Sequence, residues 1–316
     1  MRAITQDAPG GPEALHLADV PRPEPLPTEV LVRVHAAGVN PIDWKTRAGG
    51  AIYRFLGDPP ILGWDVSGLV EAVGWGVHTL EVGDEVIAMP WFPRQAGAYA
   101  EYVTAPSRHF ARKPASLDHV HAAAVPLAAL TAWQSLITTA NLQHGQRVLV
   151  HAAAGGVGHF AVQIAKAHGA HVIGSASAGK HEFLRELGVD DVVDYQARPF
   201  EEVVSDVDVV LDLLGDTVDH TSTRSLDVLR PGGLLIAVPS NLSPDLIPHA
   251  TQRGLRARGV QVEPDGHALA EIARLIDAGS LRVEVDQVFP LADAAQAHRV
   301  GETGRTRGKL VLSLTD

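Results

Sequence analysis

The segment that most constrains the fold is VLVHAAAGGVGHFAVQIAK, residues 148–166, which joins a short apolar run, a glycine-rich turn and an amphipathic helical pattern. The turn has the spacing of the G-x-G-x-x-G fingerprint, with Ala153 at the first position and Gly155 and Gly158 at the others. In this fingerprint the second glycine lets backbone amides approach a pyrophosphate, and the third lets the helix pack closely on the strand. The segment predicts a dinucleotide site, with a purely structural turn as the alternative.

Short apolar runs alternate with helical patterns on both sides of this turn and beyond it. We expect helices at 157–168 and 180–188, and strands at 148–151, 170–176, 190–195, 207–214, 232–239 and 257–263. Short runs of this kind are typical of parallel strands that are covered on both faces. The pattern predicts an α/β fold with a doubly wound, parallel Rossmann sheet.

The residues before this region indicate a different architecture. Residues 29–39 alternate apolar and polar side chains, and further short strand patterns are separated by glycine and proline, which suggests a barrel or sandwich. Residues 116–140 have a helical pattern that Pro126 divides in two. A last strand pattern at 308–314 could return to the first domain. Two domains are expected, because 316 residues are too many for one ordinary core.

Composition excludes several classes of function. The chain has no cysteine, so disulfides, thiolate zinc sites and cysteine nucleophiles are excluded. Its formal net charge is −11 and no dense Lys/Arg cluster is present, which argues against nucleic acid as a partner. No apolar run is long enough to cross a membrane, and the first residues lack the pattern of a signal peptide. We expect a cytoplasmic protein with no membrane partner.

The strand after the glycine turn indicates which nucleotide is bound. An NAD site places an acidic residue about 20 residues beyond the glycines, where it binds the ribose 2′-hydroxyl. Residues 174–181 contain no acid here, but they contain Ser175, Ser177 and Lys180. Hydroxyls and an ammonium group suit a 2′-phosphate, which a carboxylate would repel. The sequence therefore favours NADPH, and the alternative is that Lys180 is an ordinary exposed lysine.

Several stretches together resemble one known family. These stretches are residues 34–49, 62–74, 82–86, 97–103, 126–136 and 152–166. They resemble the zinc-independent quinone oxidoreductases, the zeta-crystallin-like branch of the medium-chain dehydrogenase/reductase superfamily. The resemblance implies a GroES-like β-barrel domain formed by residues 1–120 and 261–316, and a Rossmann NADP-binding domain at 121–260. It also implies nucleotide and substrate in the cleft between them, and a homodimer.

The resemblance also implies a reaction that needs no metal. Where zinc alcohol dehydrogenases carry a cysteine and a histidine ligand, this chain has Asn40 and Trp64. We therefore expect no zinc site. The expected reaction is hydride transfer from NADPH to a quinone or an α,β-unsaturated carbonyl, since such acceptors spread the incoming charge onto an oxygen.

Site residues are carried over from the family by position. The catalytic candidates are Asn40, near the nicotinamide and the substrate carbonyl, and Tyr53, a possible proton donor or oxyanion partner. The substrate candidates are Trp44, Tyr53, Trp91 and Phe92. The cofactor candidates are Asn40, Thr131, Gly155, Gly156, Val157, Gly158, Ser175, Ser177, Lys180, Tyr195, Pro239, Ser240 and Lys309.

Several candidates have a structural alternative. Asn40 could cap a local turn, Tyr53 could belong to the core or a lid, and Trp44 could simply be packed in the core. Asp65 is expected to fix structure rather than transfer protons. Two other functions stay open as well: an enoyl-thioester reductase of the same superfamily, and a non-catalytic NADPH-binding protein.

Overall fold

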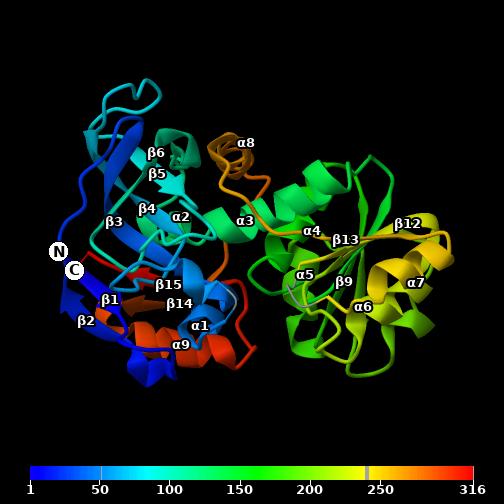
Figure 1. Cartoon of the computed structure of the whole chain (residues 1–316). Helices are drawn as coiled ribbons and strands as arrows, with labels where there is room; N and C mark the ends of the chain where they lie inside the picture. Colours follow the sequence, from blue (N-terminus) through cyan, green and yellow to red (C-terminus); the bar gives the residue numbers. More distant parts are fainter. Residues whose placement is uncertain (51, 239–241, 316) are drawn as a thin grey trace. The chain divides into compact units, whose positions relative to one another are not determined.

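The computed structural model describes residues 1–50, 52–238 and 242–315 (Figure 1). The chain divides into two compact units. Unit 1 comprises Met1–Leu130 and Glu263–Asp316, and unit 2 comprises Thr131–Val262. The first division falls inside helix α3 (Pro126–Trp133), later than the predicted position 120, and the second falls at 262, near the predicted 260. None of the helices in the described ranges has the length and hydropathy needed to span a bilayer.

Unit 2 contains one six-stranded sheet in the order β10-β9-β8-β11-β12-β13, and every neighbouring pair is parallel. The predicted doubly wound sheet is therefore confirmed. Its strands are β8 (Arg147–Val150), β9 (His171–Ala176), β10 (Asp191–Asp194), β11 (Val207–Asp212), β12 (Leu229–Ala237) and β13 (Arg256–Gly259). The chain order reverses between β8 and β11. Open α/β sheets bind ligands at such a switch point, outside the carboxyl ends of the strands.

The helices of unit 2 connect these strands. They are α4 (Gly158–Ala167), α5 (His181–Glu186), α6 (Thr221–Arg224) and α7 (Leu246–Gln252), with 3-10 turns η5 (Ala178–Lys180), η6 (Phe200–Glu202) and η7 (Ser225–Asp227). A π-helix, Gln134–Thr139, follows α3. The core combines inward side chains of the central strands with Phe200, Leu226 and Leu246.

Unit 1 is built around the long strand β3 (Glu29–Val39). One edge of β3 pairs with β4. The other edge has two partners, because eleven residues are enough for both: β6 pairs with Glu29–Arg33, and β15 pairs with Ala36–Val39. The sheet order is β14-β15-β3-β4-β5-β7, and a separate pair is formed by β1 and β2. The last strand therefore returns to the first domain.

The remaining elements of unit 1 have the following bounds. The strands are β1 (Arg2–Thr5), β2 (His16–Asp19), β4 (Val66–Val73), β5 (Glu85–Ala88), β6 (Tyr102–Pro106), β7 (Phe110–Arg112), β14 (Val285–Pro290) and β15 (Lys309–Ser313). The helices are α1 (Pro41–Arg47), α2 (His119–Ala123), α8 (Gly266–Asp277) and α9 (Ala294–Glu302), with η1 (Pro12–Ala14), η2 (Tyr53–Phe55), η3 (Ser107–His109) and η8 (Leu291–Asp293).

Helix α1 has a well-defined start and a close neighbour. It begins directly after β3, where Asn40 is extended and Pro41 occupies the first helical position, for which proline is preorganised. It packs against α9 at Gly301, where a Cβ would lie 2.6 Å from the Trp44 ring. This close approach fixes α1, and with it Asn40, against the rest of unit 1.

Candidate active site

The glycine turn of unit 2 has the backbone that the fingerprint requires. Ala153 is outside the left-handed region, so alanine fits where the fingerprint has its first glycine, and the left-handed residue is Ala152, at φ 49°. A Cβ on Gly158 would lie 2.7 Å from the Cα of Ala153, so only glycine lets α4 start this close to the turn. The packing role predicted for Gly158 is confirmed. Binding of a pyrophosphate by Gly155, Gly156, Val157 and Gly158 stays a prediction.

Ser175 has a different role from the predicted one. Its side chain is buried, and its Oγ lies 3.0 Å from Nδ1 of His151, while Nε2 of His151 lies 3.0 Å from Oγ of Ser225. The Ser225 hydroxyl donates to the Thr221 carbonyl (2.6 Å), so it accepts from His151, whose ring therefore carries its proton on Nε2. Burial lowers the pKa of His151 to about 4. Because the Ser175 hydroxyl is used inside the unit, we no longer assign it to a 2′-phosphate.

Ser177 and Lys180 remain candidates for the phosphate, and Tyr195 remains a candidate for the adenosine. Ser177 precedes η5, and its carbonyl accepts the Lys180 N–H at 2.9 Å. Tyr195 is 55% exposed and follows β10, whose register with β9 pairs Asp194 with Ala176. Tyr195 and Ser177 therefore follow neighbouring strands at the same sheet edge. The carboxylate of Asp194 accepts the Gln196 N–H at 3.0 Å.

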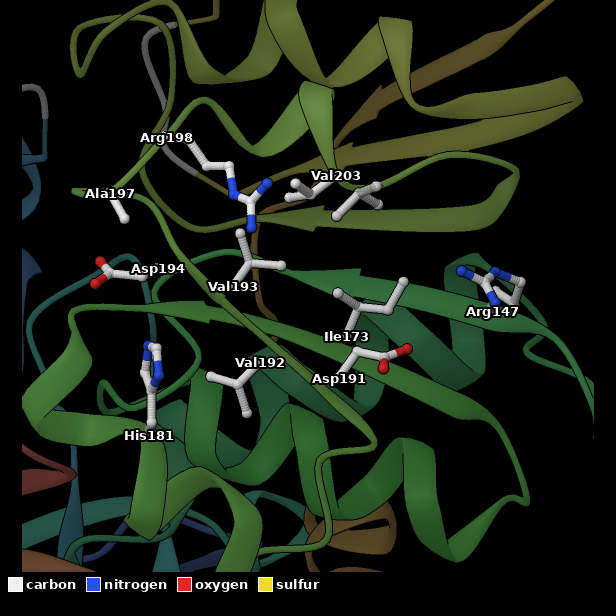
Figure 2. A pocket seen from close by; sticks show the side chains of 11 residues that line it. Arg147, Ile173, His181, Asp191, Val192, Val193, Asp194, Ala197, Arg198 and Val203 are labelled. Carbon is white, nitrogen blue, oxygen red and sulfur yellow. The ribbon is translucent and has the colours of Figure 1, made fainter.

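A further cofactor candidate of unit 2, Thr131, lies apart from the main hollow of that unit. Thr131 is buried on α3, whereas Pro239 and Ser240 lie outside the described residues. A hollow of about 410 Å³ lies beside β9 and β10. It is lined by the side chains drawn in Figure 2, which are Arg147, Ile173, His181, Asp191, Val192, Val193, Asp194, Ala197, Arg198, Val203 and Val204. None of the predicted phosphate residues lines this hollow.

Asn40 lies in a buried polar cluster of unit 1. Its Nδ2 donates to Oδ2 of Asp65 at 2.8 Å, and its Oδ1 accepts from the Lys309 ammonium. The ammonium also donates to the Val39 carbonyl (3.0 Å) and to Oδ2 of Asp65 (3.2 Å), and Oδ1 of Asp65 accepts the Leu127 N–H at 2.6 Å. Asn40, Asp65 and Lys309 are 2%, 0% and 3% exposed. The β3–β15 register, which pairs Leu310 with Val39, brings Lys309 to Asn40.

This cluster changes the interpretation of Lys309. An ammonium group has three N–H donors, and Val39, Asn40 and Asp65 supply three acceptors. No donor is left for a cofactor, so Lys309 is a positioning residue rather than the direct cofactor ligand that we predicted. The pair it forms with Asp65 is buried, and loss of either partner would leave an uncompensated charge.

The same cluster orients the Asn40 amide. The oxygen faces Lys309 and one N–H faces Asp65, so the amide has a single orientation. Among the described residues, no acceptor is present for the second N–H. Asn40 is also the N-cap residue of α1, and its backbone N–H donates to Oδ2 of Asp43 at 2.6 Å. Asp65 fixes the structure around Asn40.

The aromatic candidates of unit 1 have separate environments. Tyr53 is half-buried in η2. Trp44 packs on α9, with its ring centre 6.2 Å from that of His298, so packing accounts for its contacts. Trp91 donates its indole N–H to the Thr104 carbonyl (2.8 Å), and Phe92 makes an edge contact with Trp64 at 5.6 Å. Substrate roles for these four aromatic residues stay predictions.

Sequence reasoning missed several buried groups of unit 1. Tyr99, His298 and Arg47 form a hydrogen-bonded chain with Asp43, described below. No local motif marks them, because Tyr99 and His298 lie 199 positions apart. In the described part of the chain no three His, Cys, Asp or Glu residues gather as a metal site.

Comparisons with known proteins agree with this geometry. Residues 26–115 match the family model of the alcohol dehydrogenase GroES-like domain, and residues 187–312 match that of the zinc-binding dehydrogenases. The chain is 36% identical to a quinone oxidoreductase of Pseudomonas aeruginosa, with 96% of each chain covered. The chain belongs to the zinc-independent quinone oxidoreductases.

Further members of this quinone oxidoreductase family show the same likeness. An NADPH-dependent alkenal/one oxidoreductase of Arabidopsis thaliana, described as chloroplastic, is 33% identical over 99% of this chain and 79% of its own. The solved quinone oxidoreductase of Coxiella burnetii matches with a TM-score of 0.93 and 38% identity, and the match covers 100% of this chain and 99% of the Coxiella chain. The quinone oxidoreductase of Escherichia coli, solved with NADPH, matches with a TM-score of 0.88 and 31% identity, and the match covers 99% of this chain and 100% of the E. coli chain. The predicted GroES-like and Rossmann fold class is confirmed.

Proposed function

We propose that this chain is an NADPH-dependent oxidoreductase that transfers hydride to a quinone or an α,β-unsaturated carbonyl. The observation that carries the proposal is the segment after the fingerprint turn. It contains no acidic residue between Gly158 and Glu182, and Ser177 and Lys180 follow the end of β9. Relatives named as quinone oxidoreductase and NADPH-dependent alkenal/one oxidoreductase support the same activity. They do not favour the enoyl-thioester reductase or the non-catalytic binder.

The residues of unit 2 fit NADPH. The close packing at Gly158 keeps the first N–H groups of α4 at the turn, where the helix end favours a pyrophosphate. Ser177 and Lys180 would hold the 2′-phosphate by hydrogen bonds and charge, and Tyr195 would lie beside the adenosine. When bound, NADPH supplies the hydride. The E. coli quinone oxidoreductase was solved with this nucleotide, which supports the assignment.

Asn40 would stabilise the acceptor during the reaction. A quinone or enone that gains a hydride on carbon gathers negative charge on its carbonyl oxygen. The second N–H of Asn40 would donate to that oxygen, and the Lys309 charge beside Oδ1 polarises the amide and makes this N–H a stronger donor. Tyr53 or water would then deliver the proton that completes the two-electron reduction.

The test is oxidation of NADPH, with NADH in parallel, by EDTA-treated protein against a panel of quinones and enones, including a thioester chain-length series. We expect turnover with NADPH preferred, and lower turnover by Asn40→Ala. Equal use of NADH would refute the cofactor assignment. Turnover confined to long enoyl thioesters would favour that alternative, and nucleotide binding with no turnover would favour a binding protein.

The oligomeric state and location belong to the same proposal. Strand β13 lies at one end of the six-stranded sheet and is mostly exposed, so a second copy could pair with it across a two-fold axis. Light scattering should then give twice the chain mass, and a monomer at working concentration would refute the homodimer. A cytoplasmic location stays a prediction, since a relative is described as chloroplastic.

A further inference from the structure

A buried chain of hydrogen bonds begins at α9 in unit 1. The Arg47 guanidinium, 3% exposed, donates from Nη2 to Glu302 (2.6 Å) and from Nη1 to Nδ1 of His298 (3.2 Å). A guanidinium cannot accept, so Nδ1 holds the lone pair and the ring proton of His298 lies on Nε2. That N–H donates to the Tyr99 hydroxyl at 3.2 Å. Burial and the Arg47 charge lower the pKa of His298 to about 3, so the ring stays neutral.

The chain continues inward to the start of α1. Because the Tyr99 oxygen accepts from His298, its hydroxyl proton is directed to Oδ2 of Asp43, at 2.9 Å. Oδ2 of Asp43 also accepts the backbone N–H of Asn40, at 2.6 Å. Tyr99 and Asp43 are both fully buried. The donors from Arg47 Nη1 through His298 to Tyr99 therefore point toward Asp43, whose carboxylate accepts the backbone N–H of Asn40.

The charge of Asp43 depends on its surroundings. Burial raises its pKa to about 7; the Asn40 N–H, the Tyr99 hydroxyl and Lys309 oppose this rise, and Asp65 adds to it. Arg47 and the neutral ring of His298 also face this cluster through Tyr99. The ionised carboxylate is the stronger acceptor for the Asn40 N–H, because charge-assisted hydrogen bonds exceed neutral ones.

We propose that Asp43, Tyr99 and His298 are positioning residues for the reaction, which fix the backbone of Asn40 while Asp65 and Lys309 fix its side chain. The inference rests on the proposed function, in which Asn40 donates to the acceptor oxygen. It predicts that kcat falls as the pH is lowered through neutrality, because protonation of Asp43 weakens its hold on the Asn40 backbone.

The test is Tyr99→Phe, which keeps the buried ring and removes the hydroxyl. We expect kcat to fall about ten-fold, the effect of one lost hydrogen bond, with KM for NADPH within about two-fold of wild type. The midpoint of the kcat–pH profile should move to higher pH, because the hydroxyl no longer stabilises the Asp43 carboxylate. Tyr102→Phe is the matched control, since that hydroxyl lies in β6, 3.5 Å from Glu71, and should leave kcat and midpoint unchanged.

A second variant covers the case in which Tyr99→Phe fails to fold. Asp43→Asn keeps the acceptor oxygen but cannot titrate, so its kcat–pH profile should lose the limb near neutrality. If wild type is active and Asn40→Ala is impaired, an unmoved midpoint in Tyr99→Phe or a retained limb in Asp43→Asn overturns this inference alone. If wild type turns over no quinone or enone, or Asn40→Ala keeps full kcat, the proposed function fails instead.

Discussion

Replacing His151 by glutamine should make the stability of the protein less sensitive to acid. The folded ring has a pKa of about 4, against the ordinary 6.5, because it is buried between two serine hydroxyls. At pH values between about 4 and 6.5, the imidazole of residue 151 is protonated in the unfolded chain but stays neutral in the folded chain. The free energy of unfolding is therefore unaffected by titration of this group above pH 6.5, and it decreases as the pH falls from 6.5 toward 4.

The magnitude follows from the size of the shift. At about 1.4 kcal/mol per pKa unit, the shift from 6.5 to about 4 makes the full loss roughly 3 kcal/mol, of which about 2 kcal/mol is lost by pH 5. Glutamine at this position cannot titrate. It should lower stability at pH 8 by about 1–2 kcal/mol through imperfect hydrogen bonds, while the difference between pH 8 and pH 5 shrinks by about 2 kcal/mol.

The assay is urea unfolding at pH 5, 6, 7 and 8, followed by circular dichroism. Burial also lowers the pKa values of His109 and His298. Both residues are present in wild type and in His151→Gln, so their effect cancels when the two pH dependences are compared. The exposed His78→Gln serves as the matched control and should leave the pH dependence as in wild type. An identical pH dependence in wild type and His151→Gln would refute a neutral, buried imidazole at this position.

Three further variants test the nucleotide site and the proton source. Lys180→Ala should weaken NADPH binding by about 1–3 kcal/mol and leave NADH binding nearly unchanged; an equal loss for both would remove Lys180 from the phosphate site. Tyr53→Phe should lower kcat far more than nucleotide affinity, and an unchanged kcat would assign the proton to water. Gly158→Ala should lower both Tm and NADPH affinity, since its Cβ would lie 2.7 Å from Ala153 Cα, whereas Gly179→Ala, with open space around the Cβ, should keep Tm. A wild-type Tm in Gly158→Ala would contradict the close packing.

The sequence was most informative where structure is local. The strand, turn and helix at 148–166 follow from adjacent residues, so the Rossmann sheet could be predicted from their period and spacing. The assignment of Ser175 to the 2′-phosphate failed because its hydrogen-bond partner, His151, follows a different strand, β8. The β8–β9 register pairs Val150 with Gly174 and so brings His151 to Ser175, and sequence distance from the glycine turn contains no information about this pairing.

The polar cluster around Asn40 could not be predicted for the same reason. Asn40 was identified by resemblance, but Lys309 lies 269 positions away and meets it only because β15 pairs with the second half of β3. A pattern within one segment cannot reveal that a distant ammonium group has all three of its donors occupied. Trp44 likewise packs against α9, an element from the far end of the chain.

The pairing of β15 with β3 has a consequence for how the protein is made. Unit 2 is one continuous segment, so it can fold on the ribosome while later residues are still being added. Unit 1 needs both its early and its late residues, and its Asp65 carboxylate has no ammonium partner until Lys309 has emerged. The nascent chain can therefore complete the parallel sheet of unit 2 before the polar cluster around Asn40 has formed. A chain that ends before β15 would leave the Asp65 carboxylate without its ammonium partner, which destabilises unit 1 and makes the chain a target of cellular quality control.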